Sequence, residues 1–186
     1  AIETEEFRAV HACWSPKHQE YLRQEDGKWY LGDTPWIGAA EEGSAMFDAV
    51  ETLLKGPEIT LPNELSFPDK DNNPRIEARL SWWKHNPATW AEAVDASANV
   101  NGQLDDLAFE HTAHHDPLDH KPIFFGHYWR TIPARFDANN AFCLDYSAGK
   151  GGHLTAYRFD PGHTAFDPNR IVHVSVGPEN ASSKLI

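Results

Sequence analysis

The fold is decided by the stretch Pro122-Ile123-Phe124-Phe125-Gly126-His127-Tyr128-Trp129. Its apolar residues predict a short buried strand, and the glycine predicts that this strand breaks just before His127. An earlier stretch, Phe7-Arg8-Ala9-Val10-His11-Ala12-Cys13-Trp14, is also apolar and compatible with a strand, and it ends at Ser15-Pro16. His11 would then lie toward the carboxyl end of a strand. Open α/β sheets bind ligands at that end, so this position is functionally interesting.

Further strands are expected in the last third of the chain. The runs Ala141–Tyr146 and His153–Phe159 flank Gly149-Lys150-Gly151-Gly152, which is a strong hairpin signal. Ile171–Val176 predicts a final strand. The coarse prediction is therefore mixed α and β, with strands dominating the end of the chain.

Helices are expected in the first half. Ser44–Lys55 carries apolar residues along one face and is followed by Gly56-Pro57, which predicts its end. A shorter helix is predicted for Ala88–Ala96. A length of 186 residues fits a single domain over 1–186. Within that domain, the residues 84–121 show only a weak helix or strand pattern, and we interpret them as a loop-rich insertion.

The net charge of the chain narrows the classes of partner that it can bind. The net charge of -12 means that the average surface repels phosphate backbones and anionic lipid. We therefore expect neither nucleic acid nor a membrane as a partner, and a phosphate-bearing ligand would need a local cation.

Cys13 and Cys143 lie in apolar stretches, which indicates buried free thiols and favours a cytoplasmic protein. Ala1–Glu6 lacks the regions of a secretory signal, and without an initiating Met we interpret Ala1 as a processed, clipped or truncated start.

Several groups of residues resemble a known family. They are Val10–Trp14, Phe125–Trp129, and Cys143–Ser147 followed by Lys150-Gly151-Gly152. The residues of these motifs and their order along the chain are similar to those of the bacterial calcineurin-like metallophosphoesterases described as diadenosine tetraphosphatase-like or serine/threonine phosphatase-like. Leu54–Glu58 and Phe67–Asp71 also resemble that subgroup, so the resemblance spans almost the whole chain.

The resemblance implies a fold and a site. The fold would be the C-terminal part of a four-layer αββα sandwich, with helices on both outer faces of two β-sheets. In this family two late histidines bind one metal ion, and the matching positions here are His11 and His127. The implied cofactor is a divalent ion, Mn, Fe or Zn, for which neutral imidazole is a good ligand. The implied activity is hydrolysis of a phosphate ester or a phosphoanhydride such as a nucleoside polyphosphate, since a metal pair activates water and neutralises phosphate charge.

The family's earlier motifs are absent from this chain. They are an Asp-x-His, a Gly-Asp followed by Asp-Arg, and a Gly-Asn-His; here Gly32-Asp33 is followed by Thr34-Pro35-Trp36. No catalytic residue is therefore assigned, and we expect this chain alone to bind metal weakly and to be inactive or nearly so. A complete enzyme would need the missing N-terminal half or a second copy of the chain. The alternative function is a non-catalytic binding or assembly module derived from the same fold.

A rival metal candidate is the run His111–His120. Its residue types bind divalent ions, but Pro117 breaks any helix there, and solvated histidines beside aspartates need no metal. Other polar residues have simpler interpretations as turn formers, sheet residues and a charge at a hairpin tip: Asn139, Asn140, Asp145, Tyr146 and Lys150. Several tryptophans could stack a nucleobase, although burial is their commoner role: Trp82, Trp83, Trp90 and Trp129.

Two geometric expectations follow from the resemblance. First, the imidazoles of His11 and His127 should converge, because a separation above about 10 Å would exceed the reach of a single metal ion with bonds near 2 Å. Second, a sheet that lacks its facing partner should expose an apolar face around Val10–Cys13 and Ile123–Phe125, which would favour association with another chain.

Overall fold

The chain divides into two compact units, which we describe separately. The computed structural model describes residues 1–22, 36–69, 72–95, 98, 102–110, 120–162 and 165–176. The first unit comprises Ala1–Trp14 together with Leu118–Ile186, and the second comprises Ser15–Pro117. The sequence predicted one domain with an insertion at 84–121. The second unit begins at Ser15, and its last part coincides with most of the range 84–121.

The first unit contains a four-stranded sheet that brings distant parts of the sequence together. Its strands, in spatial order, are β1 (Ile2–Glu3), β2 (Arg8–Ala9), β7 (Ile123–Phe125) and β8 (Ala141–Cys143). Strand β1 is antiparallel to β2, whereas β2, β7 and β8 are parallel to one another. The carboxyl ends of these three parallel strands therefore lie along the same edge of the sheet.

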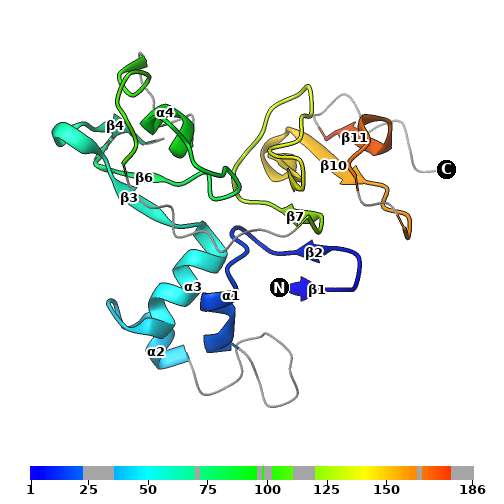
Figure 1. The fold of residues 1–186 in the computed structure, drawn as a ribbon, viewed down its shortest axis with the longest axis horizontal. Coiled ribbons are helices and arrows are strands. Elements are labelled where there is room, and N and C mark those ends of the chain that lie inside the picture. Colours follow the sequence, from blue (N-terminus) through cyan, green and yellow to red (C-terminus); the bar gives the residue numbers. More distant parts are fainter. Residues whose placement is uncertain are drawn as a thin grey trace. The chain divides into compact units, whose positions relative to one another are not determined.

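A three-stranded antiparallel sheet follows in the same unit. Its order is β11 (Ile171–Ser175), β10 (His153–Tyr157) and β9 (Asp145–Tyr146), and Figure 1 labels β10 and β11. The short 3-10 helix Ala148–Lys150 makes the predicted turn between β9 and β10. Gly152 is required there, because a Cβ atom at this position would lie 2.2 Å from the carbonyl oxygen of Tyr146.

The predicted strand Ala141–Tyr146 is divided between the two sheets, so this part of the hairpin prediction was wrong. Residues up to Cys143 pair with β7, whereas Asp145 and Tyr146 pair with β10. The change of partner follows from the hydrogen bonds at this point. The N–H of Leu144 still donates to the carbonyl oxygen of Phe125, but the carbonyl of Asp145 accepts from the N–H of Arg130.

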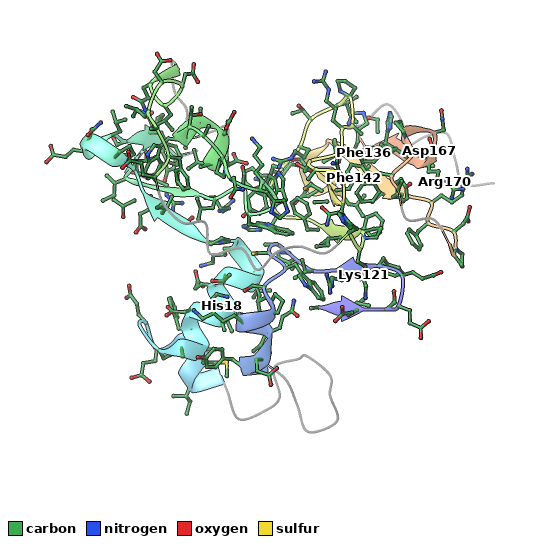
Figure 2. All side chains as sticks on the ribbon, viewed as in Figure 1. His18, Lys121, Phe136, Phe142, Asp167 and Arg170 are labelled. Carbon is green, nitrogen blue, oxygen red and sulfur yellow. The ribbon has the colours of Figure 1, made fainter. Side chains whose placement is uncertain are left out.

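An aromatic core fills the first unit. Phe142 is fully buried, and its ring centroid lies 5.0 Å from that of Phe136; both residues are labelled in Figure 2. Phe166 stacks on Phe136, with centroids 4.8 Å apart. Phe124 is 8% exposed and contacts the rings of Phe7, Tyr157, Phe159 and Phe166. The expected exposure around Ile123–Phe125 was therefore wrong, because these aromatic side chains cover Phe124, and Ile123 and Phe125 are also buried. Around Val10–Cys13 it was wrong for Ala12 and Cys13, which are buried, whereas His11 is exposed.

Several exposed apolar side chains lie on the antiparallel pair of β10 and β11. Leu154 pairs with Val174 across the strands, and Ala156 pairs with Val172, so these residues share one face. Leu154 is 62% exposed, and both valines are also exposed. The opposite face carries His153, Thr155 and Tyr157 of β10.

The second unit begins with helices. They are α1 (Pro16–Gln19), which continues as a 3-10 helix over Glu20–Leu22, α2 (Trp36–Ala40) and α3 (Ala45–Lys55). Helix α3 confirms the predicted helix and both of its ends. The Ser44 hydroxyl oxygen accepts a hydrogen bond from the N–H of Phe47, and Gly56 follows the last turn with a φ of 87°.

The rest of the second unit is built of short strands around an apolar cluster. The elements are β3 (Glu58–Thr60), a 3-10 helix (Pro62–Glu64), β4 (Phe67–Pro68), β5 (Pro74–Arg75), β6 (Glu77–Arg79) and α4 (Trp90–Ala93). β3 pairs with β6 and β4 pairs with β5, both antiparallel. Trp90, Val94, Ala98 and Leu104 are buried in this cluster. Part of the expected loop-rich range 84–121 thus contributes core residues.

The fold class is mixed α and β, as the sequence predicted. Among the described residues, no helix is both long enough and apolar enough to cross a membrane. Cys13 and Cys143 are buried free thiols, which confirms that part of the cysteine prediction. Asn139 and Asn140 form a turn before β8, also as predicted.

Candidate metal centre

His11, His127 and Asp145 occupy equivalent positions on the three parallel strands. Each lies two residues beyond the last residue of a parallel strand: His11 follows β2, His127 follows β7 and Asp145 follows β8. Asp145 is also the first residue of β9. Because these strands are parallel and adjacent, the three residues lie at the same edge of the sheet. All three belong to the first unit.

The two histidines converge, as the sequence predicted. Their imidazole ring centroids are 5.4 Å apart, and the ring planes are inclined by 50°. The backbone enforces this approach, because the N–H of Val10 donates to the carbonyl of Phe124 and the N–H of Gly126 donates to the carbonyl of His11. A Cβ atom at Gly126 would lie 3.3 Å from that His11 oxygen, so a glycine suits the close contact. His11 is exposed and His127 is half-buried.

The backbone of His127 is held in an uncommon conformation by Asp145. His127 has a φ of 69°, in the left-handed region that non-glycine residues rarely adopt. Its N–H donates to Oδ2 of Asp145 at 3.1 Å, while Oδ1 accepts from the N–H of Ser147 at 3.0 Å. Ser147 also lies in the left-handed region, with a φ of 60°. One carboxylate thus fixes two strained turns, one of which directs the imidazole of His127.

From the sequence we interpreted Asp145 as a sheet residue, and its role in holding the backbone of His127 was not predicted. It does begin β9, but its side chain also bridges the loop after β7 and the turn before β10. A signal was present, because an acidic residue two positions beyond a buried strand is a candidate for the carboxyl edge of a parallel sheet. That signal required knowledge that β8 is parallel to β7.

The His11–His127 pair fits one metal ion as two of its ligands. Zinc–nitrogen bonds of about 2.0–2.1 Å place two coordinated imidazole centroids about 5 Å apart, which is close to the observed spacing. Within the part of the chain that the structure describes, no group of three or more His, Cys, Asp or Glu residues is arranged to hold a metal ion. The pair is therefore an incomplete coordination set among those residues, since stable protein sites use three or four ligands.

No family model, curated protein or solved structure matches this chain. The features that bear on function are therefore the motifs and the geometry around His11 and His127. Of the rival run, His111–Asp119 lies outside the described residues, while His120 is described and exposed. Gly32 to Pro35 also lies outside them.

Trp129 is exposed beside this edge, two residues after His127. Its exposed fraction is 55%, and the ammonium group of Lys150 lies 3.5 Å from its ring centroid in a cation–π contact. Burial was therefore the wrong interpretation for Trp129, whereas Trp82, Trp83 and Trp90 are buried as expected. The exposed indole and the lysine leave an aromatic and cationic surface close in sequence to the histidine.

A cavity of about 350 Å³ lies along the loop that continues from Trp129. Its lining includes the side chains of two arginines and two aromatic residues: Arg130, Arg135, Phe136 and Tyr146, with Thr131, Ile132, Pro133 and Asp137 completing it. Arg130 is oriented by Asp137, whose Oδ1 accepts from Nη2 at 2.6 Å and from Nε at 2.9 Å. The N–H of Arg130 donates to the carbonyl of Asp145, which connects the cavity wall to the residue that holds His127.

Proposed function

We propose that this chain is part of a metal-dependent hydrolase that cleaves a phosphate ester or a phosphoanhydride. The observation that supports this proposal is the convergence of His11 and His127 at the carboxyl ends of adjacent parallel strands. Both residues lie in the motifs that resemble calcineurin-like metallophosphoesterases. The cytoplasm stays the predicted location.

In the proposed site, His11 and His127 hold one divalent ion, Mn, Fe or Zn, through neutral imidazole nitrogens. When bound, the ion would polarise a phosphoryl oxygen and offset phosphate charge. Such an offset matters for this chain, because its net charge of -12 repels an anionic substrate. Asp145 would keep His127 directed toward His11, because its two oxygens accept the N–H groups of His127 and Ser147.

The remaining ligands belong to residues outside this chain in this proposal. They would come from the N-terminal half of the domain or from a second copy, and the complete fold would be a four-layer αββα sandwich. The two sheets of the first unit would each contribute to one of its β-layers. We therefore expect the chain alone to bind metal weakly and to hydrolyse an aryl phosphate poorly, because two ligands are too few for a stable site.

An NMR-detected zinc titration of the purified chain tests the proposed ligands. The imidazole signals of His11 and His127 should shift together with the same dependence on zinc concentration. His127→Asn should abolish the shift at His11, whereas His85→Asn, at an exposed position in the second unit, should leave it unchanged. If both signals stay in place while those of other histidines move, the pair is no metal site. Robust manganese-dependent turnover would show instead that the chain holds a complete ligand set.

A non-catalytic binding or assembly module is the second candidate. It is favoured by the absence from this chain of the Asp-x-His, Asp-Arg and Gly-Asn-His motifs. The coding sequence that precedes Ala1 separates the two candidates. If it encodes those motifs, the protein that includes them should hydrolyse p-nitrophenyl phosphate with manganese, and His11→Asn should abolish that activity. If it does not, the module is the better proposal.

A further inference from the structure

A second pair of histidines lies on the hairpin of β10 and β11. His153 is the first residue of β10, and His173 is the central residue of β11. The register places Thr155 opposite His173 and Ser175 opposite His153. The two histidines are therefore diagonal neighbours on one face of the hairpin, within reach of each other's side chains. Their imidazole centroids are 5.6 Å apart, with 76° between the ring planes.

This spacing suits the joint binding of one metal ion. Two imidazoles on one ion, with bonds of about 2.0–2.1 Å, have centroids about 5 Å apart, so a small side-chain adjustment brings both nitrogens within bonding distance. The scaffold is also regular, because paired residues continue along both strands from His153 and Ser175 to Tyr157 and Ile171. A hairpin held in this register fixes the two Cβ atoms before any ion binds.

Thr155 supplies an independent observation at the same place. It lies on the face that carries both histidines, two residues from His153 and directly opposite His173. Its side chain is 7% exposed, yet among the described residues its hydroxyl has no hydrogen-bond partner. A buried hydroxyl without a partner costs free energy, and it is ordinarily satisfied by protein or by ordered water. A water molecule on an ion between the imidazoles would provide that partner.

We propose that His153 and His173 form a weak binding site for a divalent transition metal ion, with water molecules as its other ligands and Thr155 hydrogen-bonded to one of them. The site is separate from the His11–His127 pair and does not depend on the proposed hydrolase function. Neutral imidazole ligands follow the general order of divalent affinities, so Cu²⁺ should bind most tightly, Ni²⁺ and Zn²⁺ less tightly, and Mn²⁺ most weakly. This order distinguishes the hairpin from a manganese site.

A copper titration of the full chain tests the proposal. The experiment uses a His11→Asn/His127→Asn background, so that the hairpin is measured without the other pair. Electron paramagnetic resonance should show nitrogen coupling from two imidazoles, and Cu²⁺ should broaden the amide signals of 153–157 and 171–175 before those of the second unit. Adding His153→Asn or His173→Asn should each weaken binding by at least about tenfold, because even the loss of an outer-shell partner costs 10- to 100-fold.

The controls decide between this site and incidental binding. His85→Asn in the same background should leave the copper affinity unchanged, and circular dichroism should show that every variant keeps its fold. An affinity that is insensitive to both hairpin substitutions, or sensitive to only one of them, overturns joint coordination by the pair. Thr155→Val should weaken binding by about tenfold; an unchanged affinity there would overturn the role assigned to Thr155.

Discussion

The carboxylate of Asp145 accepts the N–H of His127, with 3.1 Å between Oδ2 and the nitrogen, across 18 residues of sequence. This hydrogen bond fixes a left-handed backbone conformation at the residue whose imidazole meets His11. The other carboxylate oxygen fixes Ser147, at the start of the turn toward Lys150. The geometry of the histidine pair therefore depends on a carboxylate that lies 18 residues from His127 in sequence.

Replacing Asp145 should lower the free energy of unfolding and also move the imidazole of His127 away from that of His11. Asp145→Ala removes both acceptors and should lower the free energy of unfolding by about 1–3 kcal/mol, because two backbone N–H groups lose a charged partner. It should also remove the nuclear Overhauser contact between the imidazoles of His11 and His127. Asp145→Asn retains one carbonyl oxygen and should show a smaller loss of both. If the contact persists in Asp145→Ala at full strength, the carboxylate does not position His127.

The elements that depend on local pattern were predictable from the sequence, whereas strand partners were not. Helix α3 was found with both ends because Ser44 and Gly56 are local signals. The strand Ile123–Phe125 was found because its apolar run is bounded by Gly126. The division of Ala141–Tyr146 between two sheets was missed, because that division depends on which distant strands each half pairs with.

At the candidate site too, features that depend on distant contacts were not predictable from the sequence. His11 and His127 were named as a pair because they match the motifs of the family that the chain resembles, and each also follows an apolar run. Their convergence follows once β2 and β7 are parallel neighbours. The role of Asp145 at His127 depends on a hydrogen bond to a residue 18 positions away, which no local pattern encodes. The exposure of Trp129 depends likewise on where its loop runs after β7, and its residue type alone favoured burial.

Phe142 should be essential for the first unit. Its ring is fully buried among Phe136, Tyr157 and Phe166, so Phe142→Ala should cost about 3–5 kcal/mol in urea unfolding followed by near-ultraviolet circular dichroism. Leu154→Ala is the matched control, because Leu154 is 62% exposed on the same unit and should change stability by less than about 0.5 kcal/mol. Equal losses in the two variants would mean that the aromatic cluster does not stabilise this unit.

Substituting Asp137, in the loop before β8, should lower stability more than substituting the exposed Asp160. Its side chain is 7% exposed, and it accepts from Arg130 through Oδ1 and from the N–H of Cys143 through Oδ2. Asp137→Ala leaves the Arg130 charge without this partner and should destabilise the chain by about 3–5 kcal/mol. Substituting the exposed Asp160, which pairs with Arg170, should cost less than about 1 kcal/mol. A thermal melt of each variant checks the order, and a greater loss at Asp160 would contradict it.

The buried thiols should make the chain less stable in alkaline solution. Burial raises the pKa of Cys143 to about 12, and burial also raises that of Cys13. A raised pKa in the folded chain means that the thiols keep their protons there, while the unfolded chain releases them above about pH 8.5. The free energy of unfolding should thus be unaffected by these groups below pH 8 and should fall between about pH 9 and 10 by about 1.4 kcal/mol per pH unit for each thiol. Urea unfolding at pH 7, 8, 9 and 10 measures this slope, and Cys143→Ala should reduce it.

At pH 8 a thiol reagent should label both cysteines only after urea is added, since the thiolate is the reactive form and both side chains are buried. Rapid labelling of the folded chain, or a stability that stays constant up to pH 10, would show that these thiols are accessible to water.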